Sequence, residues 1–371
     1  MSLFPSGVIV DGTDLVGREA TVRRWMTWLH GGQSIVVAGP RRMGKSSVAH
    51  ETLRRLEGVA GLRTFAFDCG AFDTEDAFAR AVVDAVLERE TGLPGVLGRI
   101  GQMLRGVEPF IVLSDHATEV ALHIGRTPPG HVMVTEAVEA LASSRAPAGV
   151  LRTAVLLDEF QAAAAWSPAT LGRFRSALQQ SAGVSVLFLG SQAHTLRALF
   201  GQSGQPFYGS AEREHLDPAS PGLWVEYLTQ RSGGTGVAIG FDEAVELVRR
   251  TGAHPYETMR VANHVVVRAL LRHASQASLA DVAAAYEATL AETADLWQER
   301  WRSAGRYSLA HHVLRQVAHG RGPYTGHRGQ ATAIGRVLRG MEDEGWLAQP
   351  APRTWAFVEP LFGEFVRRLP G

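Results

Sequence analysis

Short apolar runs alternate with amphipathic segments along the first half of the chain. Four runs rich in Val, Leu, Ile and Phe have the length of buried strands; they are residues 34–38, 62–68, 153–157 and 184–189. Apolar positions recur at helical spacing in the segments around them, which are residues 48–57, 74–90, 134–143 and 167–181. Strands and helices that alternate in this way predict an α/β fold with a parallel sheet.

Residues 91–130 interrupt this alternation. The segment is rich in Gly and Pro, and its clearest apolar run covers only residues 110–113. We interpret the segment as an insertion or a helical elaboration of the sheet.

The pattern changes beyond about residue 216. Residues 222–300 show successive helical patterns, which predict a second, helical domain. Helical patterns at 308–318 and 330–344 then precede extended pieces at 346–348 and 354–358, an order that predicts a C-terminal winged helix. The expected domains are residues 1–215, with an N-terminal segment 1–32, residues 216–300 and residues 301–371.

Charge and cysteine content limit the class of protein. The 37 basic and 37 acidic residues balance, so no global field draws the chain to nucleic acid or an anionic membrane, although the last 71 residues hold ten Arg against five acidic residues. The single cysteine, Cys69, excludes an intrachain disulfide and fits a reducing compartment. The start of the chain lacks a secretory pattern, and no apolar run is long enough to span a membrane. We therefore expect a cytoplasmic protein without a membrane partner.

Lys45 is the only lysine among the 37 basic residues. A compact ammonium group on a flexible stem cannot be replaced by a planar guanidinium where a small pocket must hold a phosphate. Its presence in a chain that otherwise uses arginine indicates a chemical requirement.

Lys45 lies in a full match to the pattern GxxxxGK[ST], between a predicted strand and a predicted helix. Backbone N–H groups at the start of such a helix bind phosphates, and glycines let the loop turn tightly. Lys45 is expected to reach the β- and γ-phosphates of ATP, and Ser46 to bind Mg²⁺. The predicted nucleotide-binding residues of this loop are Gly39, Pro40, Arg41, Arg42, Met43, Gly44, Lys45, Ser46 and Ser47.

Asp158 and Glu159 follow the strongest predicted strand, at the carboxyl end where ligands bind in open α/β sheets. Asp158 is expected to bind Mg²⁺ directly or through water, as Walker B aspartates do. Glu159 is expected to turn toward the γ-phosphate and polarise a water molecule for hydrolysis. The alternative is that this acidic pair only caps a helix.

These motifs resemble the STAND-type ATPases of the archaeal ATPase family, which are relatives of the AAA+ and origin-recognition ATPases. The resemblance covers about residues 15–260 and includes LVGRE at residues 15–19, the strand end LLDEFQ and the later FLGSQ. It implies a P-loop ATPase domain, a helical lid in residues 216–300, and ATP with Mg²⁺ bound between them.

The resemblance also implies further site residues. Val16 and Arg18 would lie beside the nucleotide base. A polar residue after the fourth strand would sense the γ-phosphate and act in catalysis, and either Ser191 or Gln192 occupies that place.

The lid would contribute Pro255, with His254 as a further candidate, to close over the nucleotide; alternatively, Pro255 only starts a helix. One departure is Ser210, which stands where family members often have an arginine. Arg213 or Arg197 could substitute for it. Without a secure arginine at this place, hydrolysis is expected to be slow or activated by a partner.

The second helix of the predicted winged domain would carry Arg336 and Arg339, with Arg328 at its approach. Such helices often enter the major groove, so these three residues are candidate DNA contacts. The acidic residues 342–344 would repel phosphates, however, and similar domains also serve as packing or protein-docking modules. Both interpretations stay open.

The sequence thus predicts a regulatory switch that binds and hydrolyses ATP with Mg²⁺. Its nucleotide state, ATP or ADP, would control association with a protein partner or with a second copy of the chain. Two alternatives are an ATP-gated DNA-binding protein resembling origin-recognition ATPases and a nucleotide-binding scaffold with little turnover.

Overall fold

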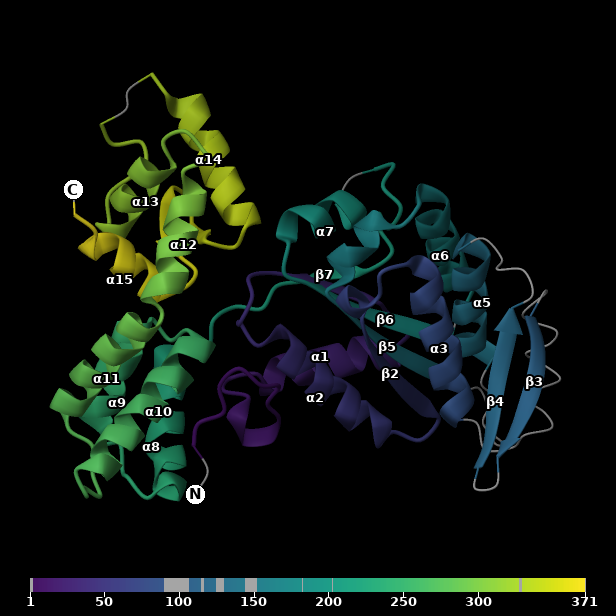
Figure 1. The fold of residues 1–371 in the computed structure, drawn as a ribbon, viewed down its shortest axis with the longest axis horizontal. Coiled ribbons are helices and arrows are strands. Elements are labelled where there is room, and N and C mark those ends of the chain that lie inside the picture. Colours follow the sequence, from purple (N-terminus) through teal and green to yellow (C-terminus); the bar gives the residue numbers. More distant parts are fainter. Residues whose placement is uncertain are drawn as a thin grey trace.

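A five-stranded parallel sheet forms the centre of the N-terminal half (Figure 1). The computed structural model describes residues 3–89, 107–114, 117–124, 130–143, 152–181, 183–201, 203–326 and 329–370. In spatial order the strands are β2 (Leu62–Asp68), β5 (Arg152–Asp158), β6 (Val184–Gly190), β1 (Ile35–Ala38) and β7 (Glu212–Glu214). Strand β6 therefore separates β1 from β5.

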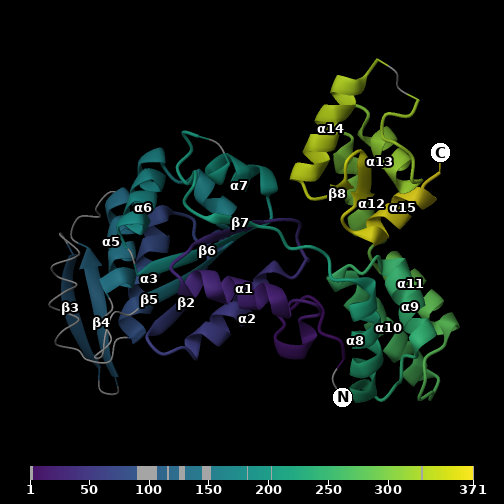
Figure 2. The same ribbon diagram turned by 180° about the vertical axis from the view of Figure 1, so that it is seen from behind.

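Helices cover both faces of this sheet, as the two opposite views show (Figures 1 and 2). Alternate residues of one strand point to opposite faces. Val36 packs with the core under one face, and Ile35 and Val37 pack with the core under the other. The first core includes residues of α3 (Glu75–Arg89), α5 (Gly130–Ser143), α6 (Pro168–Gln180) and α7 (Ala193–Phe200), and the second those of α1 (Glu19–His30) and α2 (Lys45–Glu57).

The predicted α/β fold with a parallel sheet is confirmed. All four predicted strands and the helices between them are present. The sequence pattern did not reveal α1, α7 or β7; the last has only three residues, two of them acidic.

The segment predicted as an insertion or a helical elaboration contains a hairpin outside the main sheet, so for its described residues the helical alternative is wrong. Its described residues form β3 (Val107–Ser114) and β4 (Ala117–Ile124), which pair antiparallel. Strand β3 includes the apolar run 110–113, and strands rather than helices satisfy its backbone groups. The other residues of 91–130, except those at the start of α5, lie outside the described part of the chain.

The second half begins with helices, as predicted. These are α8 (Pro221–Ser232), α9 (Phe241–Thr251), α10 (Pro255–Leu271), α11 (Leu279–Glu292) and α12 (Ala294–Ala304). The chain then forms α13 (Ala310–Ala318), α14 (Ala331–Asp343), a hairpin of β8 (Leu347–Ala351) and β9 (Thr354–Phe357), and α15 (Pro360–Arg368).

One continuous hydrophobic core joins α8–α11 to the C-terminal elements. It includes Val265 of α10, Trp297 of α12 and Phe362 of α15. The ring centroids of Trp297 and Phe362 are 5.4 Å apart. In addition, Leu361 N donates a hydrogen bond to the buried Glu257 carboxylate at 3.1 Å. The C-terminal elements are therefore packed firmly on the helical bundle.

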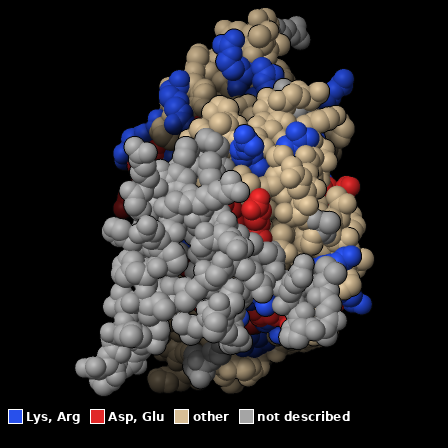
Figure 3. Space-filling view, turned by 90° about the vertical axis from the view of Figure 1, so that its right-hand side faces the viewer, with Lys and Arg blue, Asp and Glu red and all other residues tan. Residues whose placement is uncertain are grey.

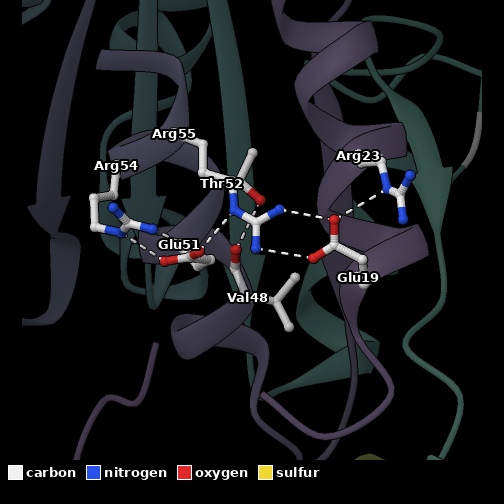
Figure 4. Close-up of polar contacts among 7 residues, drawn as sticks. All are labelled: Glu19, Arg23, Val48, Glu51, Thr52, Arg54 and Arg55. Atoms are coloured by element: carbon white, nitrogen blue, oxygen red, sulfur yellow. Dashed lines mark hydrogen bonds and ion pairs between the residues drawn. The ribbon is translucent and has the colours of Figure 1, made fainter. Parts of the chain in front are cut away.

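Charged side chains fasten α1 to α2 (Figure 4). Buried Glu51 accepts hydrogen bonds from Arg54 Nε and Arg55 Nε, both at 2.7 Å, and Arg55 also donates to Glu19 of α1 at 2.9 Å. The hydrogen bond from Arg54 is the main reason that the pKa of Glu51 falls to about 2. This network fixes the helix whose first turn follows the phosphate-binding loop.

Candidate nucleotide-binding site

The loop between β1 and α2 has the shape of an anion-binding site. Arg42 and Gly44 both have left-handed backbone conformations, with φ of 65° and 85°, and no side chain caps the first turn of α2. Successive backbone N–H groups that turn in this way converge on a bound anion. The positive end of the helix dipole adds to the attraction.

Lys45 is buried at the start of α2. Its Nζ donates hydrogen bonds to Gly39 O at 2.8 Å and Pro40 O at 2.6 Å. Burial lowers the pKa of Lys45 to about 8, and the charges of Glu159 and Asp158 oppose part of this effect. The ammonium group is thus held within the loop, close to both carboxylates.

A pocket of about 480 Å³ opens above this loop, between the sheet and helices α8 and α10. Many of the predicted site residues line it together: Val16, Arg18, Arg41, Arg42, Met43, Gly44, Lys45, Ser46, Ser47, Asp158, Glu159 and Pro255. Four others do not line it, and these are Gly39, Pro40, Ser191 and Gln192. Of these four, Gly39 and Pro40 still contribute the carbonyl groups that hold Lys45.

The acidic pair lies at the carboxyl end of β5. Asp158 Oδ1 accepts a hydrogen bond from Glu159 N at 2.8 Å, and Glu159 itself has a left-handed backbone with φ of 48°. Ser191, at the end of the intervening strand β6, donates to Glu159 Oε2 at 2.9 Å. The strand order thus explains why Ser191 meets Glu159. Gln192 instead precedes α7, is exposed and accepts a hydrogen bond from Thr195.

Arg18 and Val16 border the pocket from the N-terminal side. Arg18 is buried, and its guanidinium donates to Asp217 O and, at 3.4 Å, to Met43 O. Burial lowers the pKa of Arg18, although Asp217 opposes this. Arg18 therefore ties the segment before α1 to both the phosphate-binding loop and the segment leading to the lid.

The helical bundle borders the pocket through the start of α10. Pro255 occupies the first turn of this helix and also lines the pocket, so both interpretations of this residue agree with its position. His254 caps the helix, because its Nδ1 accepts a hydrogen bond from Glu257 N. Burial lowers the pKa of His254 to about 4, so its imidazole is neutral at pH 7.

The predictions missed several pocket residues. Residues 5–10 pass over the site, and Val10 N donates to Ser47 Oγ at 3.2 Å. Trp224 of α8 and both Tyr256 and Met259 of α10 also line the pocket. Tyr256 directly follows Pro255 in sequence, which was a usable signal. The N-terminal residues carry no motif and depend on tertiary packing.

Comparison with known proteins agrees with this geometry. Residues 29–199 match the family model of an AAA domain. The fold is that of a P-loop NTPase. No curated protein sequence matches the chain.

Solved structures resemble nearly the whole chain, not only the residues that match the family model. The Walker-type ATPase of Pyrococcus abyssi aligns with a TM-score of 0.66 at 16% identity, covering 99% of this chain and 100% of the other. The Aeropyrum pernix ORC2 protein, in ADPNP–ADP complexes, aligns with a TM-score of 0.58 at 16% identity over 98% and 96% of the two chains. The Aeropyrum pernix ORC1 protein, in complex with DNA, gives 0.51 at 14% over 95% and 92%.

The C-terminal elements contact the phosphate-binding loop directly. Arg42 Nη1 donates to Glu359 Oε1 at 3.1 Å, and its guanidinium lies 4.4 Å from the centre of the Tyr256 ring. Arg300 also donates to Glu359, on its other carboxylate oxygen. A Cβ atom placed on Gly345 would lie 3.7 Å from Pro40 Cα. The N-terminal half, the helical bundle and the C-terminal elements thus meet at this loop.

Two acidic residues, Glu342 and Asp343, take part in the same docking, because Arg197 of α7 lies 3.9 Å from both. Glu344 instead accepts a hydrogen bond from Tyr307, within the C-terminal region, at 2.8 Å. Arg213 donates to Phe200 O. Neither Arg197 nor Arg213 is among the residues that line the pocket.

The candidate DNA contacts lie apart from the pocket. Arg336 and Arg339 are exposed on α14, opposite its buried Ile334, Val337 and Leu338. Arg328 lies outside the described residues. On the face seen in Figure 3, basic side chains stand among uncharged residues, with acidic ones between them.

The described residues contain no group of three or more His, Cys, Asp or Glu side chains placed to hold a metal ion. Among the same residues, no helix is both long and apolar enough to cross a membrane.

Proposed function

We propose that the protein is a regulatory switch of the STAND or AAA+ type that binds and hydrolyses ATP with Mg²⁺. Its nucleotide state controls association with a protein partner or with a second copy of the chain. The pocket between the AAA domain and the lid supports nucleotide binding. Its buried ammonium group, uncapped helix start and paired carboxylates are what a triphosphate with a divalent cation requires.

Each group in the pocket has a distinct task in this proposal. The N–H groups of the loop and Lys45 bind the phosphates. The Ser46 hydroxyl and the Asp158 carboxylate supply hard oxygen ligands, which suit Mg²⁺. The metal ion would neutralise charge on the phosphate oxygens.

Glu159 is the proposed general base. Its carboxylate accepts the proton of the water that attacks the terminal phosphorus, and the bond to the bridging oxygen breaks with its electrons leaving on ADP. Ser191 holds Glu159 from the neighbouring strand by the 2.9 Å hydrogen bond.

The proposal of a switch rests on the contact between Arg42 and Glu359. Arg42 belongs to the phosphate-binding loop and lines the pocket, yet its guanidinium pairs with a carboxylate of the C-terminal region. Phosphate oxygens are strong acceptors for guanidinium groups. A bound triphosphate therefore competes with Glu359 for Arg42, which links the content of the pocket to the docking of the C-terminal elements.

Two measurements test the switch. Phosphate release from purified protein tests turnover, with Lys45→Ala as the inactive control; ATP binding without release would favour the scaffold alternative. Amide hydrogen exchange around residues 345–363, with and without ATP, tests the coupling. We expect faster exchange with ATP in the wild type but not in Lys45→Ala, and equal exchange in all samples would contradict the switch.

An ATP-gated DNA-binding protein is a second candidate, favoured by the exposed Arg336 and Arg339 on α14. In this proposal α14 is the recognition helix of a winged helix whose wing is the β8–β9 hairpin. Duplex binding should then weaken steeply with salt, and Arg336→Ala with Arg339→Ala should reduce the salt slope by about two. Arg268→Ala, on the exposed side of α10, is the matched control. Salt-independent or absent binding would reject this candidate.

A further inference from the structure

Gln161 stands directly behind the proposed general base. It lies in the short 3₁₀ helix Phe160–Ala165 that follows the acidic pair. Its Nε2 donates hydrogen bonds to Glu159 Oε2 and, at 3.3 Å, to Ser191 Oγ. Gln161 does not itself line the pocket.

The amide of Gln161 is only half satisfied. Its Oε1 is buried and has no hydrogen-bond partner within the described part of the chain. Such a group destabilises a folded protein unless something else requires it. The neighbouring Gly190 leaves just enough room, because a Cβ atom there would overlap Gln161 Oε1. The hydrogen bonds that Gln161 Nε2 donates to Glu159 and Ser191 therefore determine the position of the side chain.

Glu159 is held at one carboxylate oxygen only. Gln161 Nε2 and Ser191 Oγ both donate to Oε2, and no donor among the described residues contacts Oε1. The left-handed backbone of Glu159, with φ of 48°, is costly for a residue with a side chain and persists where surrounding contacts require it. Oε1 is thus the oxygen that can accept a hydrogen bond from water in the pocket that Glu159 lines.

The same contacts reach the phosphate-binding loop. Arg41 Nε, on the loop, donates to Ser191 Oγ at 3.4 Å. Ser191 therefore links Arg41 to Glu159 and Gln161 along a single path.

We infer that Gln161 is a positioning residue, which holds Oε2 of Glu159 so that Oε1 receives the proton of the attacking water. This inference rests on the proposed ATP hydrolysis. Gln161 would act only through Glu159 and would leave nucleotide binding to the loop and Lys45.

Gln161→Met is the decisive variant, because methionine has a similar volume and no hydrogen-bond donor. We expect kcat for ATP hydrolysis to fall roughly 10- to 100-fold, with KM and the ATP dissociation constant unchanged. We expect Tm to stay the same or rise, because the buried unpartnered oxygen is removed. A purely structural role would instead lower Tm. Gln180→Met, an exposed change on α6, should leave all four quantities unchanged.

The double variant Glu159→Gln with Gln161→Met completes the test. Because Gln161 acts through Glu159, the second substitution should reduce turnover no further once the base is gone. An additional loss, or an unchanged kcat in Gln161→Met alone, would overturn the positioning role while leaving ATP hydrolysis intact. Absence of turnover in the wild type would overturn this inference together with the proposed hydrolysis.

Discussion

Arg42 Nη1 and Glu359 Oε1 lie 3.1 Å apart although 317 residues separate them in sequence. Glu359 is almost fully buried, whereas the Arg42 side chain is 40% exposed. The pair therefore joins a buried carboxylate of the C-terminal region to a guanidinium that a ligand in the pocket can still reach.

Arg42→Ala should loosen the docking of the C-terminal elements without unfolding them. Because Arg42 is partly exposed and Arg300 still pairs with Glu359, we expect a loss of only about 1 kcal/mol or less. Hydrogen exchange around residues 345–363 should rise to the level that ATP produces in the wild type. Arg23→Ala is the matched control from an ion pair elsewhere whose two side chains are both exposed. Unchanged exchange in Arg42→Ala would show that the pair does not hold the two regions together.

Glu159→Gln should retain ATP binding and lose turnover. The amide keeps the size of the carboxylate but cannot take the proton, so we expect kcat to fall roughly 10²- to 10⁴-fold. Calorimetric titration and phosphate release measure the two effects separately. Equal turnover in this variant and the wild type would remove Glu159 from the reaction.

ATP affinity should depend on pH through Lys45. The charged form binds phosphates, and its pKa is about 8 in the free protein. Affinity should therefore be constant below about pH 7 and fall above pH 8, by up to about tenfold per pH unit, because binding must then take up a proton. Titrations between pH 6 and 9.5 measure this. The guanidinium of Lys45→Arg does not titrate in this range, so any ATP affinity that this variant keeps should not fall between pH 8 and 9.5. If its affinity falls as that of the wild type does, Lys45 is not the group that causes the pH dependence.

Glu51 should contribute to stability in a pH-dependent way. Its pKa is about 2 in the folded protein, below the usual 4.5, so its contribution is present above about pH 4.5 and is lost as the pH falls toward 2. Glu51→Gln should lower the free energy of unfolding at pH 7 by about 1–2 kcal/mol. The difference from wild type should shrink between pH 4.5 and pH 2. Glu299→Gln, at an exposed position, should show neither effect, and a pH-independent difference would contradict the role of the ion pairs.

Local patterns in the sequence predicted the sheet and the phosphate-binding loop well. The strand Leu62–Asp68 has the predicted bounds, although Arg63 and Thr64 interrupt its apolar residues. The loop is short and its chemistry is local, so one motif predicts the placement of Lys45 in the pocket.

Contacts between distant segments could not be predicted in the same way. The pair of Arg42 and Glu359 depends on how the C-terminal elements pack, and no local pattern encodes it. The choice between Ser191 and Gln192 needed the strand order, which brings the end of β6 beside Glu159. Gln161 was visible in the motif LLDEFQ, but its role depends on a backbone conformation at Glu159 that sequence does not reveal.

The continuous core shared by α8–α15 determines which parts of the molecule can rotate relative to one another. A rotation that separated the lid from the C-terminal elements would expose Trp297 and Phe362 to water, whereas a bend in the connection between β7 and α8 would expose neither. When the pocket opens or closes, helices α8–α11 and the C-terminal elements would therefore move together as one rigid unit. A protein truncated near residue 300 would expose the apolar surface of α8–α11 that the C-terminal elements bury. The C-terminal region therefore cannot be exchanged for another domain unless this surface of the helices is redesigned.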